Sequence, residues 1–557
     1  MALEQRTVPT RTLWSDRLAE KVTACIAPGR AGQPIVCASG ISPSGPIHMG
    51  NLREVFTTHL VVEALRARGH EVVHLHSWDD YDRLRRVPAG VDRSFERYVG
   101  MPLSDVPDPR GDYHSWAERH MSEFLPTTRR LGIEMTEVRQ SERYRSGRYN
   151  AAIRRAMERR GLVFDTLAEQ QTVGRDARPL EERRRQYFPF KPYCEVCGRD
   201  DTWVTAYEAE TVQYTCRHGH TGAMSLADGA RISGKLVWKV DWPMRWQHEG
   251  VAFEPAGEDH HAPTGSATVA RLLVRGVFGG QPPQTAVYSF VSLAGAGGKM
   301  SSSSGRVALP HTALTVLEPA VVRWLYIRRL PHQSFAIDLT PKGVPKLYDE
   351  WDRFVTLATA PGATPADAEI HRLCVETTSK TICESQRPVS FRLLASVADI
   401  TQADRGQMGR IIAEYLDEPA APIHALLDAM EPRLSCAIRY ATQLVPSEQR
   451  TVVREAFSDG AWESLDERTR HGVETLAEEI SGARSLDELT KLVYSVPKQM
   501  LGLPDEAPAT PELKHAQREF FKAVYLLLLG TGTGPRLPTL LLSIGSERAR
   551  RLLANQG

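Results

Sequence analysis

The stretch from Pro34 to Trp78 constrains the fold more than any other part of the sequence. The apolar run PIVCASG, starting at Pro34, predicts a short buried strand, and EVVHLHSW, starting at Glu71, predicts a second one. Between them, apolar residues recur at helical spacing from Leu52 to Val62, and Gly69 is well placed to end that helix. A strand, a helix and a strand in this order predict the start of a doubly wound parallel α/β sheet.

The loop between the first strand and the helix carries the first candidate functional residue. Residues 38–55 read ASGISPSGPIHMGNLREV, with glycines and prolines typical of a tight turn. Ligands of doubly wound sheets bind outside the carboxyl ends of the strands, which is where this loop is expected. His48 is therefore a candidate ligand contact, although a purely structural loop explains the same residues.

The rest of the chain predicts three further regions. After residues 1–80, the first half of a Rossmann-like catalytic domain, a Pro-, Arg- and aromatic-rich stretch predicts an insertion over residues 81–231. The α/β pattern resumes in KLVWKVDWPMRW and TAVYSFVSL, which predicts the second half of the domain over residues 232–348. Residues 349–557 predict an all-helical domain, with helix starts expected at Ser464 with Glu467, Ser485 with Glu488, and Thr510 with Pro511.

Composition excludes several classes of protein. The 557 residues are 41% hydrophobic and 25% charged, which is typical of a globular protein of more than one domain. Lys plus Arg number 69 against 68 Asp plus Glu, so no overall basic field is present. The start MALEQRTVPTRTLW lacks the apolar core of a secretory signal, and the longest aliphatic run, LLLLG, is too short to span a bilayer. We therefore expect a cytoplasmic protein without a membrane partner.

A second glycine-rich loop follows the last predicted strand. The segment GAGGKMSSSSG, residues 295–305, contains Lys299 among glycines and serines. A phosphate-binding P-loop would need Gly at position 293 and Ser or Thr at position 300, and the chain has Leu293 and Met300. What remains is a lysine in a flexible loop able to close over a ligand, or a plain linker.

Three of the eight cysteines are grouped with histidines in the predicted insertion. Cys194 and Cys197 form a CxxC pair, and after eighteen intervening residues Cys216 precedes His218 and His220. This spacing is close to that of a zinc ribbon, in which four ligands fold a segment too small for its own core. It predicts a structural Zn²⁺ site with Cys194, Cys197, Cys216 and His220, or His218 as the alternative fourth ligand.

Taken together, the two loops resemble the signature sequences of class I aminoacyl-tRNA synthetases. HMGN at residues 48–51 and KMSSS at residues 299–303 match in order, separation and placement. HSWDDYDRLRRVP, GMPLSDVPDP, WKVDWPMRW, EPAGEDHH and GGKMSSSSG narrow the resemblance to class I lysyl-tRNA synthetases, from about Ser39 to Arg306. It implies activation of L-lysine by ATP and Mg²⁺, transfer to tRNA(Lys), and an α-helical anticodon-binding domain.

The resemblance also implies roles for individual residues. It places His48, Asn51 and Lys299 in catalysis, although many class I enzymes have His where Asn51 stands and Lys where Ser302 stands. The implied ATP contacts are Pro43, Gly45, His48, Gly50, Asn51, Lys299, Met300, Ser301 and Ser302. The implied amino-acid contacts are Ser42, Trp242, His260 and Tyr288. Aromatic side chains and a hydrogen-bond acceptor are the groups that bind an ammonium group with an aliphatic stem.

Two questions stay open in the sequence. The resemblance suggests a second metal site made of Asp108, Asp112, His114 and His120, but the spacing of its histidines is not that of a helix face. Two other functions remain as alternatives: a class I enzyme for another amino acid such as glutamate, which would want an Arg-rich pocket, and a non-catalytic synthetase-like protein that binds RNA. The sequence does not indicate an oligomeric state.

Overall fold

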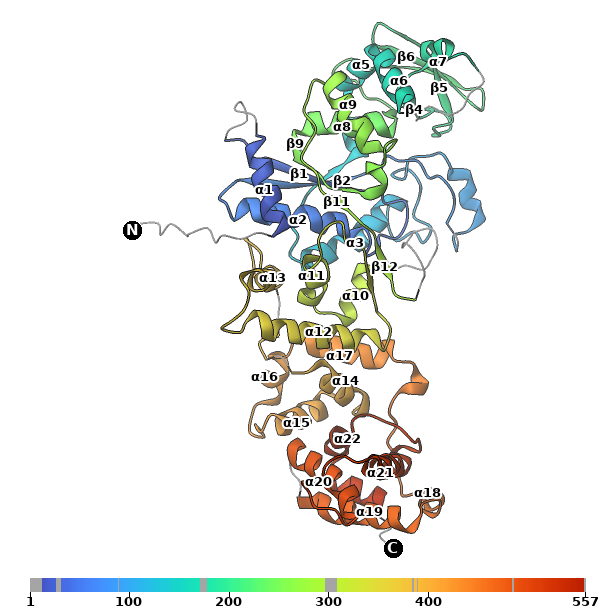
Figure 1. Cartoon of the computed structure of the whole chain (residues 1–557). Helices are drawn as coiled ribbons and strands as arrows, with labels where there is room; N and C mark the ends of the chain where they lie inside the picture. Colours follow the sequence, from blue (N-terminus) through green and yellow to red (C-terminus); the bar gives the residue numbers. More distant parts are fainter. Residues whose placement is uncertain are drawn as a thin grey trace. The chain divides into compact units, whose positions relative to one another are not determined.

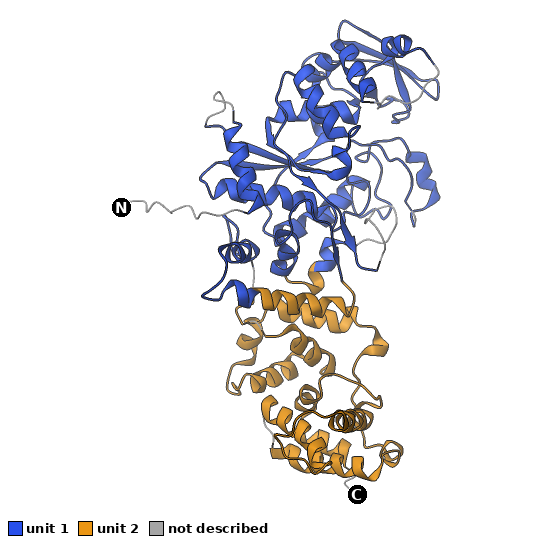
Figure 2. Cartoon of the chain, in the orientation of Figure 1, with its two compact units in different colours: residues 1–313, 319–338, 355–382 blue, residues 314–318, 339–354, 383–557 orange. Residues whose placement is uncertain are grey.

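The chain forms two compact units. The computed structural model describes residues 13–26, 32–88, 90–170, 178–295, 308–382, 385–387, 389–482 and 485–554. The first unit comprises residues 1–313, 319–338 and 355–382, and the second comprises residues 314–318, 339–354 and 383–557 (Figure 2). None of the described helices is long and apolar enough to cross a membrane.

A parallel sheet lies at the centre of the first unit (Figure 1). Its strands, in spatial order, are β3 (Thr136–Arg139), β2 (Val72–Trp78), β1 (Ile35–Ile41) and β9 (Val251–Phe253). All three pairings are parallel. The two predicted strands and the helix between them, α2 (Leu52–Arg66), are confirmed, and Gly69 follows that helix with a φ of 83°. The expected doubly wound α/β class is therefore correct.

Apolar helices cover both faces of this sheet. Side chains of neighbouring strand residues point to opposite faces, so Cys37 and Ala38 belong to different cores. Cys37 packs in a core with Val61 and Leu65 of α2. Ala38 packs in another core with Trp242 and Trp246 of α8 (Trp238–Glu249). Burial on both faces explains why the strand sequences are nearly continuous apolar runs.

Part of the predicted insertion belongs to the sheet. We expected residues 81–231 to lie outside the sheet, but β3 falls within this range and pairs with β2 along Leu75 to Trp78. The strand has only four residues, TEVR, and Val138 alone is buried. The sequence therefore lacks the alternating hydrophobic pattern that would predict a strand there. The remainder of the range holds α3 (Trp116–Arg130), α4 (Gln140–Arg145), α5 (Asn150–Glu158), α6 (Arg160–Glu169), α7 (Leu180–Gln186), β4 (Phe190–Pro192), β5 (Thr202–Glu208), β6 (Thr211–Cys216) and β7 (Thr221–Ser225).

Short strands and helices complete the first unit. They are β8 (Gly234–Leu236), β10 (Ala256–Gly257), α9 (Ser266–Gly276), β11 (Val287–Tyr288), β12 (Val291–Leu293), α11 (Pro319–Ile327), β13 (Phe335–Ile337) and α13 (Pro365–Val375). β10 pairs with β11 and β12 pairs with β13, in both cases parallel. The buried guanidinium of Arg323 in α11 donates to the backbone carbonyls of Leu131 and Leu373, which ties these elements together.

The second unit is helical throughout its described residues, as expected. Its helices are α14 (Phe391–Ile400), α15 (Arg405–Tyr415), α16 (Ile423–Asp428), α17 (Arg433–Arg439), α18 (Asp459–Glu463), α19 (Glu467–Glu479), α20 (Leu486–Gln499), α21 (Pro511–Leu529), α22 (Leu537–Ile544) and α23 (Ser546–Leu553). Both α10 (Pro310–Val316) and α12 (Gly343–Ala358) contain residues of both units. The boundary expected at residue 349 therefore falls inside a helix.

Two of the three predicted helix starts are confirmed. Ser485 caps α20 in a capping box with Glu488, and Thr510 caps α21 ahead of Pro511. The start predicted at Ser464 is wrong, because Ser464 ends α18 and the carboxylate of Asp466 caps α19 by accepting from the N–H of Thr469. Asp is as good a cap as Ser, so the sequence offered two candidate starts two residues apart.

Candidate active site

The loop that follows β1 is held tightly from several sides. His48 is buried, and its backbone N–H donates to Oδ1 of Asn51 at 3.0 Å. The N–H of Met49 donates to the carbonyl of Ala308, and the Met49 carbonyl accepts from the hydroxyl of Tyr326. A Cβ atom at Gly50 would lie 2.8 Å from the His48 ring, so only glycine leaves room for this histidine. The loop is thus built around the position of His48.

Asn51 serves the loop more than the helix. It stands at the N-cap position of α2, yet its side chain makes no capping hydrogen bond and instead closes the loop onto His48. Pro43 and Gly45 are buried in the same loop, whereas Ser42 and Gly50 are partly exposed. The structure therefore places five of the expected ATP contacts, Pro43, Gly45, His48, Gly50 and Asn51, in one ordered turn at the carboxyl end of β1.

A pocket of about 120 Å³ opens beside His48. Three segments line it: the β1–α2 loop with the first turn of α2, the residues after β10, and β11 with β12. The described lining residues are Ile41, His48, Gly50, Asn51, Glu54, Gly257, Asp259, His260, Tyr288, Phe290 and Val291. Two carboxyl groups, those of Glu54 and Asp259, line the pocket, and this described lining contains no Lys or Arg.

Glu54 is the pocket residue that the sequence reasoning missed. Its Oε1 accepts a hydrogen bond from the N–H of Gly40 at 2.6 Å, and its Oε2 accepts one from the hydroxyl of Tyr288 at 2.7 Å. Burial raises the pKa of Glu54 to about 8, although both hydrogen bonds favour the ionised form and oppose this rise. The only signal in the sequence was an acidic residue in the first turn of α2, close to His48.

The expected amino-acid contacts are placed in different environments. His260 and Tyr288 line the pocket, whereas Ser42 is not among its described lining residues. Trp242 also lies outside this lining, in the hydrophobic core that contains Ala38 and Trp246. Its ring stacks on Trp238, with centroids 5.3 Å apart, and meets the ring of His260 edge-on at 5.6 Å. Trp242 thus supports a wall of the pocket from behind.

A buried charge network anchors α8 to the sheet near this pocket. Nη1 of Arg245 donates to Oδ1 of Asp79 at 2.6 Å and to the hydroxyl of Ser77 at 2.9 Å, both at the end of β2. The second terminal nitrogen of Arg245, Nη2, donates to the carboxylate of Asp241, which lies one helical turn earlier in α8. Burial raises the pKa of Asp79, and the Arg245 guanidinium opposes that rise. The paired charges therefore fix α8 without leaving a buried carboxylate alone.

The second predicted loop cannot be placed. Lys299, Met300, Ser301 and Ser302 lie outside the described residues. The strand β12, which precedes them in the sequence, contributes Val291 to the pocket. Their expected contacts with ATP therefore rest on the sequence.

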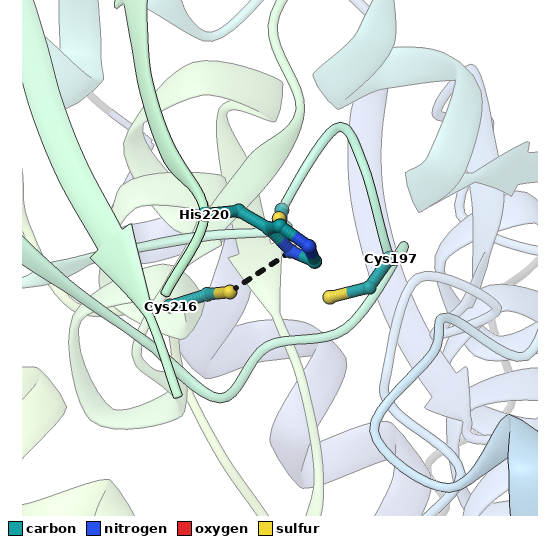
Figure 3. Close-up of side chains that lie close together, drawn as sticks. Cys197, Cys216 and His220 are labelled. Carbon is teal, nitrogen blue, oxygen red and sulfur yellow. Dashed lines mark hydrogen bonds between the residues drawn. The ribbon is translucent and has the colours of Figure 1, made fainter. Parts of the chain in front are cut away.

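The predicted zinc ligands come together in the first unit (Figure 3). One ligand atom from each of Cys194, Cys197, Cys216 and His220 lies within 4.8 Å of all the others. Nδ1 of His220 is 3.3 Å from Sγ of Cys216 and 3.6 Å from Sγ of Cys194. The alternative ligand, His218, is exposed, with its Nε2 3.5 Å from Nη1 of Arg199. The geometry therefore selects His220 as the fourth member.

The second expected metal site is not assembled. Both carboxylate oxygens of Asp108 are used, since Oδ2 accepts from the N–H groups of Asp112 and Tyr113 and Oδ1 accepts from Arg119. His120 is buried against Trp116, while Asp112 and His114 are exposed. Among the described residues, only the Cys/His cluster groups enough ligands closely enough for a metal ion. Asp108 is thus paired within its own loop, and the second metal site that the resemblance suggested stays a prediction.

Comparisons with known proteins find relatives that cover nearly the whole chain. A family model described as "tRNA synthetases class I (K)" matches residues 12–380. The lysine–tRNA ligase of Streptomyces coelicolor is 43% identical, covering 97% of this chain and 98% of that protein. The lysine–tRNA ligase of Pyrococcus horikoshii is 32% identical over 98% and 99% of the two chains. A solved glutamate tRNA ligase from Elizabethkingia meningosepticum is 13% identical with a TM-score of 0.45, which is too distant to support an argument.

The raised pKa of Glu54 predicts a pH dependence of stability. Between the ordinary pKa of 4.5 and the folded value of about 8, the folded state binds more protons than the unfolded state. The free energy of unfolding should therefore fall as pH rises from 5 to 8, by on the order of 1.4 kcal/mol per pH unit from this group alone. Denaturant unfolding of the wild type and of Glu54→Gln at several pH values, followed by tryptophan fluorescence, measures the difference.

The matched control for this measurement is Glu20→Gln, which removes an exposed carboxyl group on α1 (Trp14–Ala24). This variant should show the same pH slope as the wild type. A Glu54→Gln protein whose unfolding free energy changes with pH as the wild type does would show that Glu54 titrates normally.

Proposed function

The chain belongs to the class I lysyl-tRNA synthetase family, and we propose how its described residues carry out that family's reaction on L-lysine, ATP and tRNA(Lys). The enzyme is an aminoacyl-tRNA ligase, which forms lysyl-adenylate and then transfers lysine to the 3′ end of tRNA. The observation that carries the proposal is the acidic pocket around Glu54 beside His48. A carboxyl-lined pocket suits a substrate with two ammonium groups, whereas the side-chain carboxylate of glutamate would find no Lys or Arg partner among the described lining residues.

In the first step the carboxylate of lysine attacks the α-phosphorus of ATP. A new C–O–P bond forms, the bond to the β-phosphate oxygen breaks, and pyrophosphate leaves with the Mg²⁺ that entered with ATP. The attacking carboxylate is already ionised, so the enzyme needs no general base. Catalysis is then a matter of alignment and of stabilising negative charge on the phosphates.

His48 and Lys299 are the proposed catalytic residues. The turn around Gly50 holds the His48 imidazole at the carboxyl end of β1, where a ring N–H can donate to a phosphate oxygen. Lys299 would supply a mobile positive charge to the same phosphates. Asn51 acts by fixing the backbone of His48. Pro43, Gly45, Gly50, Met300, Ser301 and Ser302 complete the proposed ATP contacts.

Glu54 is the proposed acceptor for an ammonium group of lysine. Its carboxyl group is held in place by Gly40 and Tyr288, so the side chain is already oriented before lysine arrives. The Tyr288 ring and His260 form adjoining walls for the aliphatic stem. Trp242 takes part indirectly, because it packs against His260, and Ser42 is proposed at the amino-acid end of the loop.

In the second step a ribose hydroxyl at the 3′ end of tRNA attacks the carbonyl carbon of the adenylate. The new ester bond to tRNA forms as the bond to the phosphate oxygen breaks, and AMP leaves. We propose that the helical unit binds the anticodon, because proteins read RNA sequence mainly from unpaired bases. Since tRNA charging serves protein synthesis, the proposed compartment is the cytoplasm.

Charging assays test this function. The wild-type chain should attach labelled lysine, and not glutamate, to tRNA(Lys) in the presence of ATP and Mg²⁺. His48→Ala and Lys299→Ala should each slow adenylate formation by roughly tenfold or more, which corresponds to at least about 1.4 kcal/mol of transition-state stabilisation. The exposed residue His471 on α19 offers a control, since His471→Ala should form the adenylate at the wild-type rate.

Adenylate formation is measured with tRNA present as well as absent, so that a requirement for tRNA does not hide the activity. Charging with glutamate in place of lysine would overturn the assignment of the pocket. A folded His48→Ala protein with full activity would overturn the role of His48.

The Cys/His cluster is the proposed site of a structural Zn²⁺. Three sulfur atoms and one imidazole nitrogen within 4.8 Å of one another match the closed four-ligand sets of structural zinc sites. Burial would raise the pKa of the Cys194 thiol. Hydrogen bonds from the N–H groups of Cys197 and Val196, and from the side chains of Cys197 and His220, together lower that pKa to about 7, so the thiolate form is accessible. A bound ion would crosslink the loop Cys194–Cys197 to the β6–β7 hairpin.

Metal analysis checks this site. We expect at least one zinc per chain, and Cys197→Ser should lose that zinc and lower the melting temperature, because the remaining ligands cannot close a tetrahedral site. His218→Ala should keep both zinc content and melting temperature, since His218 lies outside the cluster. Zinc-free wild-type protein of unchanged stability, or equal zinc loss in His218→Ala, would contradict the proposed ligand set.

A further inference from the structure

The helical unit contains a cavity of about 530 Å³ that the chemistry described above does not use. Six segments of this unit line it: α14, the end of α15, the turn that follows α17, and the first residues of α20 and α22, with Pro345 from α12. Its volume lies within the range of about 300–1,000 Å³ found for small-molecule sites. The cavity can therefore hold a ligand the size of one nucleotide.

Two tyrosines provide aromatic surface in this cavity. The ring of Tyr440 meets Phe391 edge-on at 5.4 Å, and Phe391 stacks on Tyr348 at 3.9 Å. The Tyr440 hydroxyl donates to the carbonyl of Pro341 at 2.6 Å, so this ring is fixed at both ends. Tyr415, the last residue of α15, is half-buried and lines the cavity from another helix. Rigid aromatic walls favour stacking of a flat ligand.

The backbone beside Tyr440 departs from a regular helix. Residues Tyr440–Leu444 form a single π-helical turn directly after α17. The guanidinium of Arg450 stabilises this turn by donating to the carbonyls of Thr442 and Val445. Such turns occur frequently at functional sites, because they place side chains where a regular helix would not.

The polar groups of the cavity suit a neutral ring with both donors and acceptors. Arg392 is already paired with Asp349, and Oδ2 of Asp399 accepts from the N–H of Thr451. The hydroxyl of Ser396 has no hydrogen-bond partner among the described residues. Two guanidinium groups and one carboxylate around apolar walls fit a nucleobase edge better than an anion or an alkyl chain.

Arg536 supplies the cation that a nucleotide phosphate would need. It lines the cavity and is exposed, and its guanidinium makes no hydrogen bond or ion pair with any residue that the structure describes. A base inside the cavity would leave its phosphate outside, where Arg536 can reach it.

We propose that this cavity holds one unpaired anticodon-loop base of tRNA, stacked on Tyr415 in the space bounded by Tyr440, with its phosphate against Arg536. The inference rests on the proposed function, since it takes tRNA as the ligand. It goes further by assigning one binding site within the helical unit.

Binding and charging of tRNA(Lys) by the full chain test this site. Tyr415→Ala should raise the KM for tRNA roughly five- to hundredfold, the loss expected for one base stacked on an aromatic ring. Arg536→Ala should raise it severalfold and weaken its dependence on salt. Tyr415→Phe should restore the wild-type KM, because stacking needs the ring and not the hydroxyl. The KM values for lysine and ATP should stay unchanged in all three.

Matched controls come from the same unit. Tyr494, which is 42% exposed on α20, and Arg410, which is exposed on α15, lie outside the described lining of the cavity. Tyr494→Ala and Arg410→Ala should therefore keep the wild-type KM for tRNA. An equal loss in these controls would show a general effect on the unit and would overturn the proposal.

Abasic tRNA identifies the base and separates stacking from a merely structural role. The Kd is measured for tRNA(Lys) transcripts with one abasic nucleotide at each unpaired anticodon-loop position in turn. At one position, the abasic nucleotide should weaken the binding of tRNA to the wild type. Tyr415→Ala should bind that abasic tRNA almost as tightly as it binds intact tRNA. Wild-type affinity in both Tyr415→Ala and Arg536→Ala, or an equal loss at every position, would refute the cavity assignment while leaving lysine charging intact. If the wild type itself does not charge tRNA(Lys) with lysine, the proposed function fails instead.

Discussion

The half-buried carboxyl group of Glu54 joins three segments that line the pocket beside His48. Glu54 stands in the first turn of α2, it accepts from the N–H of Gly40 in β1, and it accepts from the hydroxyl of Tyr288 in β11. A buried acid without such partners would be strongly unfavourable. Its two hydrogen bonds offset part of that cost. They also tie the first turn of α2 to β1 on one side and to β11 on the other. Glu54 therefore links the three segments around the pocket, while Gly50, Asn51 and Tyr326 hold the loop that carries His48.

The pocket beside His48 and the cavity of the helical unit each combine rigid positioning with a group left ready for its ligand. In the first unit, Gly50 and Asn51 fix His48, and the Arg245 network fixes α8 behind the pocket. In the second unit, Phe391 and Pro341 fix Tyr440, while Arg536 stays exposed. Such preorganisation reduces the entropy lost on binding. It also explains why the proposed chemistry needs few catalytic groups.

Local patterns made much of this structure predictable. The strands β1 and β2, the helix end near Gly69 and the caps at Ser485 and Thr510 all depend on near neighbours in the sequence. Features that depend on distant residues were missed. β3 has one buried residue and exists through pairing with β2, and the role of Glu54 depends on Tyr288, 234 positions away. Similarly, the CxxC spacing permitted His218 or His220, and only the path of the β6–β7 hairpin distinguishes them.

Proton release on lysine binding tests the central role of Glu54 most directly. With a pKa of about 8, the free carboxyl group is mostly protonated at pH 7, and an ammonium group beside it favours the ionised form. Titration calorimetry with lysine, in buffers of different ionisation enthalpy, counts the protons released. The wild type should release close to one proton per lysine at pH 7 and about half as much at pH 8, where about half of the Glu54 carboxyl groups are already ionised, whereas Glu54→Gln should bind lysine weakly without release. Equal proton release in Glu54→Gln, or none in the wild type, would contradict the account.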